Sequence, residues 1–148
     1  AQQLNMMKEL RALSKNERFE QPLRLLMTIP GIAQVSGLTI LSEIDDIARF
    51  KDSSHLASFV GLIPMCYSSG EHDGTGNLTV RRHAQLRWLI VESAWIAARK
   101  DPVLAAAYVE YCRRMKPSKA IVKIARRLVN RIYFVLKHQH PYVNCYVS

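Results

Sequence analysis

The sequence predicts an all-α protein with a helix-hairpin-helix-like segment and one long glycine-rich loop. Apolar residues recur three and four positions apart through most of the 148 residues, as they do on the buried face of an α-helix. Residues 61–80 interrupt this period and hold four of the six glycines. With 49% apolar and 22% charged residues, the chain has the size and composition of one folded domain.

Two helices joined by a polar segment are expected in the N-terminal part. Residues 2–14 have helical spacing and are expected to be the end of a longer helix, followed by a polar joint over residues 15–21. Pro22 is expected in the first turn of the next helix, because proline lacks the N–H that a first turn leaves unpaired. Pro30-Gly31 is expected to end that helix.

Two further helices are expected before the glycine-rich loop. The first carries apolar residues between positions 35 and 44. Asp45 and Asp46 are expected to cap a short turn after it, since an aspartate side chain accepts hydrogen bonds from backbone N–H groups at a helix start. Ser53 or Ser54 is expected to cap the next helix.

The remaining helices follow the loop 61–80, in which a short β-hairpin across Gly74–Gly76 is an alternative for part of the chain. A helix is expected over residues 83–99. Asp101-Pro102 is expected to cap and begin the next helix, and Pro117-Ser118 the last one, which runs amphipathically to about residue 138.

Positive charge is the main departure from an average composition. The chain has 21 Lys and Arg against 12 Asp and Glu, a formal net charge of +9 and an isoelectric point near 9.8. This balance favours a polyanionic partner, most often nucleic acid; a basic protein without a specific partner is the alternative.

Cysteine usage and hydropathy restrict the cellular location and the kinds of partner that are expected. The 3 cysteines lack CxxC spacing, which indicates free thiols in a reducing compartment and predicts a cytoplasmic location. No run approaches the ~18 apolar residues of a membrane span, so no membrane is expected as a partner. The spacing of Cys66, His72 and His83 does not predict a metal site.

Residues 22–45 resemble a helix-hairpin-helix motif, with two apolar helices around a Pro-Gly-Ile turn. Glycine allows close approach of a DNA backbone, and N–H groups at the start of the second helix can then bind a phosphate. Gly31 and Ile32 are therefore predicted phosphate contacts. A simple turn in a helical core is the alternative.

The last helix predicts a second phosphate-binding surface. Its cations lie opposite the apolar stripe with no acid among them, and the predicted contacts are Lys119, Lys123, Arg126 and Arg127. A solvated face is the alternative.

The loop 61–82 combines candidate nucleophiles with a flexible backbone and positive charge. Ser68 and Ser69 are the candidate nucleophiles, and Gly70 allows a close approach to a phosphate. The guanidinium groups of Arg81, Arg82 and Arg87 match phosphate oxygens and are predicted to bind them.

Other interpretations of this loop stay open from the residues alone. A solvated linker is one. Cys66 is a rival nucleophile without a visible triad, and Tyr67 and Tyr142 are tyrosines of the kind that attack phosphodiesters but also of the kind that pack.

The order of segments resembles one known family over about residues 22–143. The segments are IPGI, LTILSEIDDIARFKDSSHLASFVGLIP, SSG, LRWLIVESAW and, after a basic helix, PYV. In this order they resemble the C-terminal domain of the insertion-sequence transposases of the IS-110/IS-116/IS-902 type, which are bridge-RNA-guided serine recombinases.

This resemblance implies a DNA recombinase in which the serine directly before the glycine, here Ser69, is catalytic, with Ser68 as second choice. It implies that residues 1–20 end a linker helix and that residues 22–143 form the transposase C-terminal domain, with a catalytic loop at 61–82 and basic helices at 83–138. Mg²⁺ would be held by a separate N-terminal RuvC-like domain and not by this chain, so the chain alone is expected to be inactive. The expected partners are DNA, a guide RNA and further copies of the full-length protein.

Two other functions are weighed against DNA transposition. One is a helix-hairpin-helix module that anchors on DNA without catalysis. The other is a helical oligomerisation domain, because Trp88, Trp95, Tyr108 and Tyr111 are residue types that often form subunit contacts.

Overall fold

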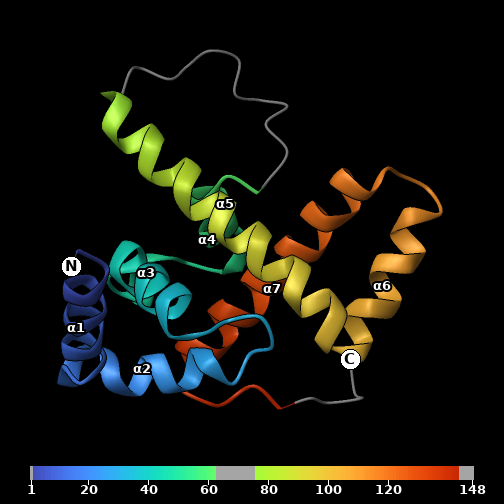
Figure 1. Ribbon diagram of the computed structural model, residues 1–148. Coiled ribbons are helices and arrows are strands. Elements are labelled where there is room, and N and C mark those ends of the chain that lie inside the picture. Colours follow the sequence, from blue (N-terminus) through green and yellow to red (C-terminus); the bar gives the residue numbers. More distant parts are fainter. Residues whose placement is uncertain (1, 63–75, 144–148) are drawn as a thin grey trace.

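The computed structural model describes residues 2–62 and 76–143, which form seven α-helices and one 3₁₀ turn without a strand. The predicted all-α fold class is confirmed for these ranges. The elements, drawn in Figure 1, are α1 (Gln2–Ser14), α2 (Glu17–Met27), α3 (Gln34–Ile44), η1 (Ile47–Arg49), α4 (Ser53–Val60), α5 (Gly76–Lys100), α6 (Pro102–Cys112) and α7 (Pro117–His138).

Helix α7 is the centre of the fold. Helices α2, α4, α5 and α6 and the turn η1 all pack against it, whereas α1 packs on α2 and α3 at one edge (Figure 1). An amphipathic helix is stabilised mainly by burial of its apolar face, and here that face is covered along its length. The predicted amphipathic character of this helix is confirmed, since its buried residues are Ala120, Ile121, Ile124, Ala125, Leu128, Val129, Ile132, Val135 and Leu136.

Helix α2 begins five residues before the predicted start at Pro22. Asn16 caps it, because the Asn16 Oδ1 atom accepts a hydrogen bond from the Arg18 N–H at 3.0 Å. Pro22 therefore lies inside α2, and the predicted polar joint over residues 15–21 shortens to the two residues before Glu17. The predicted end at Pro30-Gly31 is confirmed, since α2 ends at Met27.

The caps between α3 and α4 differ in part from the prediction. Asp46 caps η1 as expected, accepting from the Ala48 N–H at 2.9 Å. Asp45 instead ends α3, with a positive φ of 66°. Asp52, and not Ser53 or Ser54, caps α4, because its Oδ1 accepts from the His55 N–H at 3.0 Å. Asp52 comes one position earlier and offers the stronger acceptor.

Helix α5 begins at Gly76, seven residues before the predicted start at residue 83. The predicted loop 61–82 is therefore shorter, and Arg81 and Arg82 belong to a helix. A β-hairpin across Gly74–Gly76 is not formed at Gly76. The weak helix formers at the start of α5 explain why its apolar period did not reveal them.

The starts of the last two helices are confirmed. The Asp101 Oδ1 atom accepts hydrogen bonds from the N–H groups of Val103 at 2.9 Å and Leu104 at 3.2 Å, and Pro102 is the first residue of α6. Pro117 opens α7 in the same way, although no side chain caps that helix.

The turn between α2 and α3 lies directly against α5. Gly31 has φ of 98°, a region that L-residues with a side chain seldom adopt. A Cβ atom there would lie 2.5 Å from the Ser93 carbonyl oxygen and 3.1 Å from Ala97. Glycine is thus required both by the backbone conformation and by the close approach of α5.

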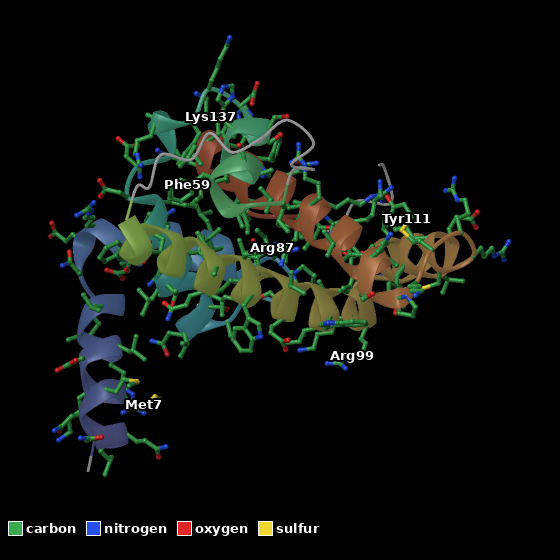
Figure 2. All side chains as sticks on the ribbon, turned by 90° about the horizontal axis from the view of Figure 1, so that it is seen from above. Met7, Phe59, Arg87, Arg99, Tyr111 and Lys137 are labelled. Atoms are coloured by element: carbon green, nitrogen blue, oxygen red, sulfur yellow. The ribbon has the colours of Figure 1, made fainter. Side chains whose placement is uncertain are left out.

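Helix α1 is the most exposed element. Several of its large apolar side chains face solvent, including Leu4, Met6 and Met7, the last of which is labelled in Figure 2. Among the described residues of α1, Leu10 packs against the core cluster. The prediction that residues 1–20 end a linker helix stays a prediction. Within residues 2–62 and 76–143, no helix is long and apolar enough to cross a membrane.

The Gly31 contact predicts a large stability loss on substitution. Gly31→Ala combines a strained backbone with a clash against the Ser93 carbonyl, so the free energy of unfolding should fall by about 2 to 4 kcal/mol in urea titrations. Gly61→Ala is the matched control, because Gly61 also has a positive φ of 86° but its added Cβ would meet only Arg87 Cδ at 3.6 Å. That variant should lose about 1 kcal/mol. Equal losses in the two variants would contradict the role given to the contact with α5.

Candidate functional site

The predicted nucleophile segment lies between two described ends. Ser68, Ser69 and Gly70 lie outside the described residues, as do Cys66 and Tyr67. On one side the described chain ends just after α4, and on the other it resumes at Gly76 in α5. Helix α5 places Arg81 and Arg82 in its first two turns, which puts two cations close to the segment in sequence. The catalytic role of the serines stays a prediction.

Arg87 joins the two elements that flank this segment. Its Nε–H donates a hydrogen bond to the carbonyl oxygen of Gly61, the residue that ends α4, at 3.2 Å. A cation is favourable at this position, because the last carbonyl groups of a helix carry partial negative charge. Figure 2 shows Arg87 on α5, where the residue is exposed and its terminal NH₂ groups make no hydrogen bond to the described residues.

The residues of the Pro-Gly-Ile turn that were predicted to bind phosphate make contacts within the protein. The Ile32 N–H donates to the Ile29 carbonyl at 3.1 Å, and the Ile32 side chain is buried. Gly31 approaches α5, as described above. At the start of α3, Ala33 supplies no side-chain cap, and its own N–H donates to Ser36 Oγ at 2.9 Å. Phosphate binding by Gly31 and Ile32 stays a prediction, and these contacts favour a structural role for the turn.

The cations of α7 divide into two groups. Arg126 donates to Asn130 Oδ1 at 2.6 Å and to Ser54 Oγ at 3.2 Å, which links α7 to α4. Arg127 donates from Nε to the Tyr111 hydroxyl at 3.1 Å and stacks over that ring at 5.5 Å. Both guanidinium groups are thereby held in fixed positions. The side chains of Lys119 and Lys123 are exposed and have no hydrogen bond or ion pair with the described residues.

Arg131, a further cation of the predicted basic face of α7, has a structural role. Its Nη1 atom lies 2.6 Å from Asp101 Oδ2, and the Asp101 side chain is fully buried while that of Arg131 is 17% exposed. The Tyr142 hydroxyl donates to the same oxygen at 2.8 Å, and the Tyr142 ring lies 4.6 Å from the guanidinium. Asp101 thus joins α6, α7 and the segment after α7. Tyr142, considered above as a nucleophile, packs here.

Asp101 is ionised in the folded protein. Burial raises the pKa of Asp101, but the hydrogen bonds from Tyr142, Arg131 and the Leu104 N–H together outweigh burial and hold the pKa below its usual value of 3.8. The sequence contains a signal for the structural role of Arg131. Arg131 lies seven residues after the buried Ile124 and therefore beside the apolar face of α7.

The aromatic residues proposed as a subunit face are partly used within the chain. Trp95 and Tyr108 pack edge to face with their centroids 5.7 Å apart, and Tyr111 holds Arg127. Trp88 is 63% exposed and is the one of these four that faces solvent.

Neither a cavity nor a metal centre marks the predicted site within the described ranges. A cavity of ≈ 670 Å³ lies between the C-terminal half of α7 and residues 140–143, and its lining includes none of the predicted site residues. No three His, Cys, Asp or Glu side chains of the described residues come together as a metal site would require.

Comparison with known proteins identifies the family. A model of the Transposase IS116/IS110/IS902 family matches residues 23–109, more than half of the chain. The chain belongs to this family. The match spans the Pro-Gly-Ile turn, the Ser-Ser-Gly segment and helix α5, so the resemblance predicted from the sequence is confirmed.

Curated relatives agree with this assignment. The chain is 28% identical over 90% of its length to the transposase for insertion sequence element IS1111A of Coxiella burnetii, and 26% identical over 86% to an uncharacterized protein of insertion element IS116 of Streptomyces clavuligerus. It is 27% identical over 76% to an uncharacterized protein of insertion element IS110 of Streptomyces coelicolor. The matches cover 37%, 32% and 28% of those proteins, so the chain spans about a third of their length.

Asp101 forms a cluster with Arg131 and Tyr142, and this Asp101 cluster predicts a specific pH dependence of the free energy of unfolding. Because the folded pKa of Asp101 lies below its unfolded value, the cluster stabilises the fold above pH 4 and this contribution disappears as the pH falls through the folded pKa. Asp101→Asn should lower the free energy of unfolding at pH 7 by about 2 to 4 kcal/mol, because the Arg131 charge loses its partner.

The same variant should also flatten the pH profile below pH 4, measured by urea titration at several pH values. The control is Asp52→Asn, which removes an exposed cap carboxylate that pairs with His55 and should change stability far less. A pH profile of Asp101→Asn that is as steep as that of the wild type would contradict the account of the cluster.

Proposed function

We propose that this chain is the part of an IS116/IS110/IS902-type transposase that cuts and rejoins DNA through a serine nucleophile. The observation that carries the proposal is the family match over residues 23–109, which includes Ser68, Ser69 and Gly70 between α4 and α5. The described residues around this segment supply positive charge, which stabilises the transition state of a phosphodiester reaction, and Arg87 also joins α5 to the end of α4.

The proposed chemistry begins with attack of the Ser69 hydroxyl on a DNA phosphorus atom. The Oγ–P bond forms, the bond between phosphorus and a deoxyribose oxygen breaks, and the Ser69 proton leaves while the departing oxygen takes up a proton. A hydroxyl of a second strand then attacks the phosphoserine, forms the new phosphodiester and restores the serine. A covalent intermediate keeps the energy of the broken bond and divides one difficult step into two.

Positive charge near the segment would stabilise this reaction. Negative charge builds up on the phosphate oxygens in the transition state, and fixed guanidinium groups stabilise it without reorganising. Arg87 is suited to this role because the Gly61 carbonyl holds its Nε, while its terminal nitrogens have no hydrogen bond to a described residue. Arg81 and Arg82, on the same helix, are proposed to act with it.

Other parts of the activity are proposed to require more than this chain. The family resemblance implies Mg²⁺, which we propose is bound by a separate N-terminal domain of the full-length protein. Pairing with a guide RNA and assembly of several protein copies are proposed for the same full-length protein, and the chain alone is expected not to recombine DNA.

The alternative of a DNA-anchoring helix-hairpin-helix module without catalysis receives less support. Such a module needs backbone N–H groups that are available to a phosphate, and the Ile32 N–H is bonded to Ile29.

Substitution of the serine in the full-length transposase tests the proposal. Ser69→Ala should abolish recombination, by at least about 10³-fold, because the nucleophile is lost while DNA binding is unchanged. Ser68→Ala is the matched control, and it should retain measurable recombination. Recombination is measured by sequencing of donor–target junctions, and binding by fluorescence anisotropy with a labelled duplex. Full recombination by the Ser69→Ala protein would overturn the proposal.

A further inference from the structure

A group of exposed cations lies at the turn between α6 and α7. This tip cluster consists of Arg113, Arg114, Lys116, Lys119 and Lys123, all of which are exposed. The Arg113 Nη1 atom lies 3.7 Å from Glu110 Oε2, and the other four cations form no ion pair with a described residue. The cluster therefore carries most of its positive charge into solvent.

The cluster is remote from the start of α5. In Figure 1 the turn between α6 and α7 lies on the right side of the molecule, and the N-terminal end of α5 lies at the upper left. Figure 2 shows Tyr111, which lies just before the cluster in sequence, at the opposite end of the molecule from Met7 of α1. The tip cluster is thus separate from Arg81 and Arg82.

The arrangement of charge is unfavourable for the chain alone. Lys116 directly precedes α7 and Lys119 lies in its first turn, where the helix dipole disfavours cations, and no acidic residue occupies that turn. Repulsion among five neighbouring cations adds to this cost. A polyanion bound across the cluster would offset both the unfavourable interaction with the helix dipole and the repulsion among the cations.

The spacing of the lysines fits a nucleic-acid backbone. Lys116, Lys119 and Lys123 are three and four positions apart and share one face of α7. At about 1.5 Å per residue they extend over about 10 Å, which corresponds to about three phosphates of one duplex strand at a rise of about 3.4 Å each. Arg127, held on Tyr111, comes one turn further along the same helix.

The composition of the cluster favours a double helix over a single strand. Proteins that bind single strands add aromatic side chains on which unpaired bases stack. Among residues 113–123 there is no aromatic residue, and the exposed members are cations, Pro117 and Ser118. Contacts of this kind bind phosphates and do not read base sequence.

We propose that the tip cluster is a second nucleic-acid contact, which binds the phosphate backbone of a double helix independently of sequence. The inference rests on the proposed function for the class of partner, but it does not depend on Ser69. Duplex DNA and duplex RNA share the recognised chemistry, and the two are separate arms of the test.

The test compares two triple variants of this chain. Lys116, Lys119 and Lys123→Ala removes the lysines of the tip cluster, and Lys8, Lys15 and Lys51→Ala removes three other exposed lysines. Binding of each to labelled duplex DNA, duplex RNA and single-stranded DNA is measured by fluorescence anisotropy over a range of salt concentrations. Thermal unfolding of both variants confirms that they are folded, and the tip variant should unfold no earlier than the wild type.

We expect the tip variant to lose about tenfold or more in affinity for at least one duplex at ~0.1 M salt. Its slope of log K against log salt should become shallower by about 2 to 3, because three phosphate contacts are lost. The control variant should lose less than about threefold. Unchanged duplex binding by the tip variant, an equal loss in the control, or a loss confined to single strands would overturn the proposal. The serine proposal would survive any of these results, and recombination by Ser69→Ala would leave the tip proposal intact.

Discussion

The buried carboxylate of Asp101 holds together the C-terminal half of this protein. It caps α6 through two backbone N–H groups, pairs with Arg131 of α7 and accepts the Tyr142 hydroxyl, while its own N–H continues α5 through the Ala97 carbonyl at 2.8 Å. A buried charge is tolerated only when such partners are present, so each of these elements must be in place for the others to be stable. The segment after α7 is fixed at a second point, since the Tyr142 N–H donates to Thr28 Oγ1 at 2.8 Å.

Because Asp101 pairs with Arg131, the positively charged residues of α7 do not all form one surface for a partner. Arg131 balances a buried charge, and Arg126 and Arg127 are held by neighbouring side chains, so three of the cations opposite the apolar stripe contribute to the fold. The lysines toward the start of α7 have no hydrogen bond or ion pair with the described residues, and the arginines that follow α6 lie just before them in sequence. Charge that stabilises the fold and charge available to a partner thus follow each other along a single helix.

Local patterns in the sequence predicted most of the helices but not their contacts. The period of the apolar residues placed α3 and α7 well, because their apolar faces are buried, and the Asp101-Pro102 pair placed the start of α6. The predicted start of α2 at Pro22 is wrong, because Asn16 supplies a cap that outweighs the preference of proline for a first turn. The pairing of Asp101 with Arg131 joins residues 30 positions apart, and the contact of Gly31 with α5 spans 62, so neither follows from local spacing. The role of Ser69 was inferred from family resemblance and not from its surroundings.

The most direct test of the account is the chemical identity of the residue that joins DNA. The full-length transposase would be incubated with a DNA substrate nicked so that the cut strand diffuses away, and the trapped protein–DNA adduct would be digested and sequenced by mass spectrometry. The account predicts a nucleotide attached through phosphate to the Oγ atom of Ser69. An adduct on Ser68, Tyr67 or another residue, or strand transfer without any covalent adduct, would contradict it.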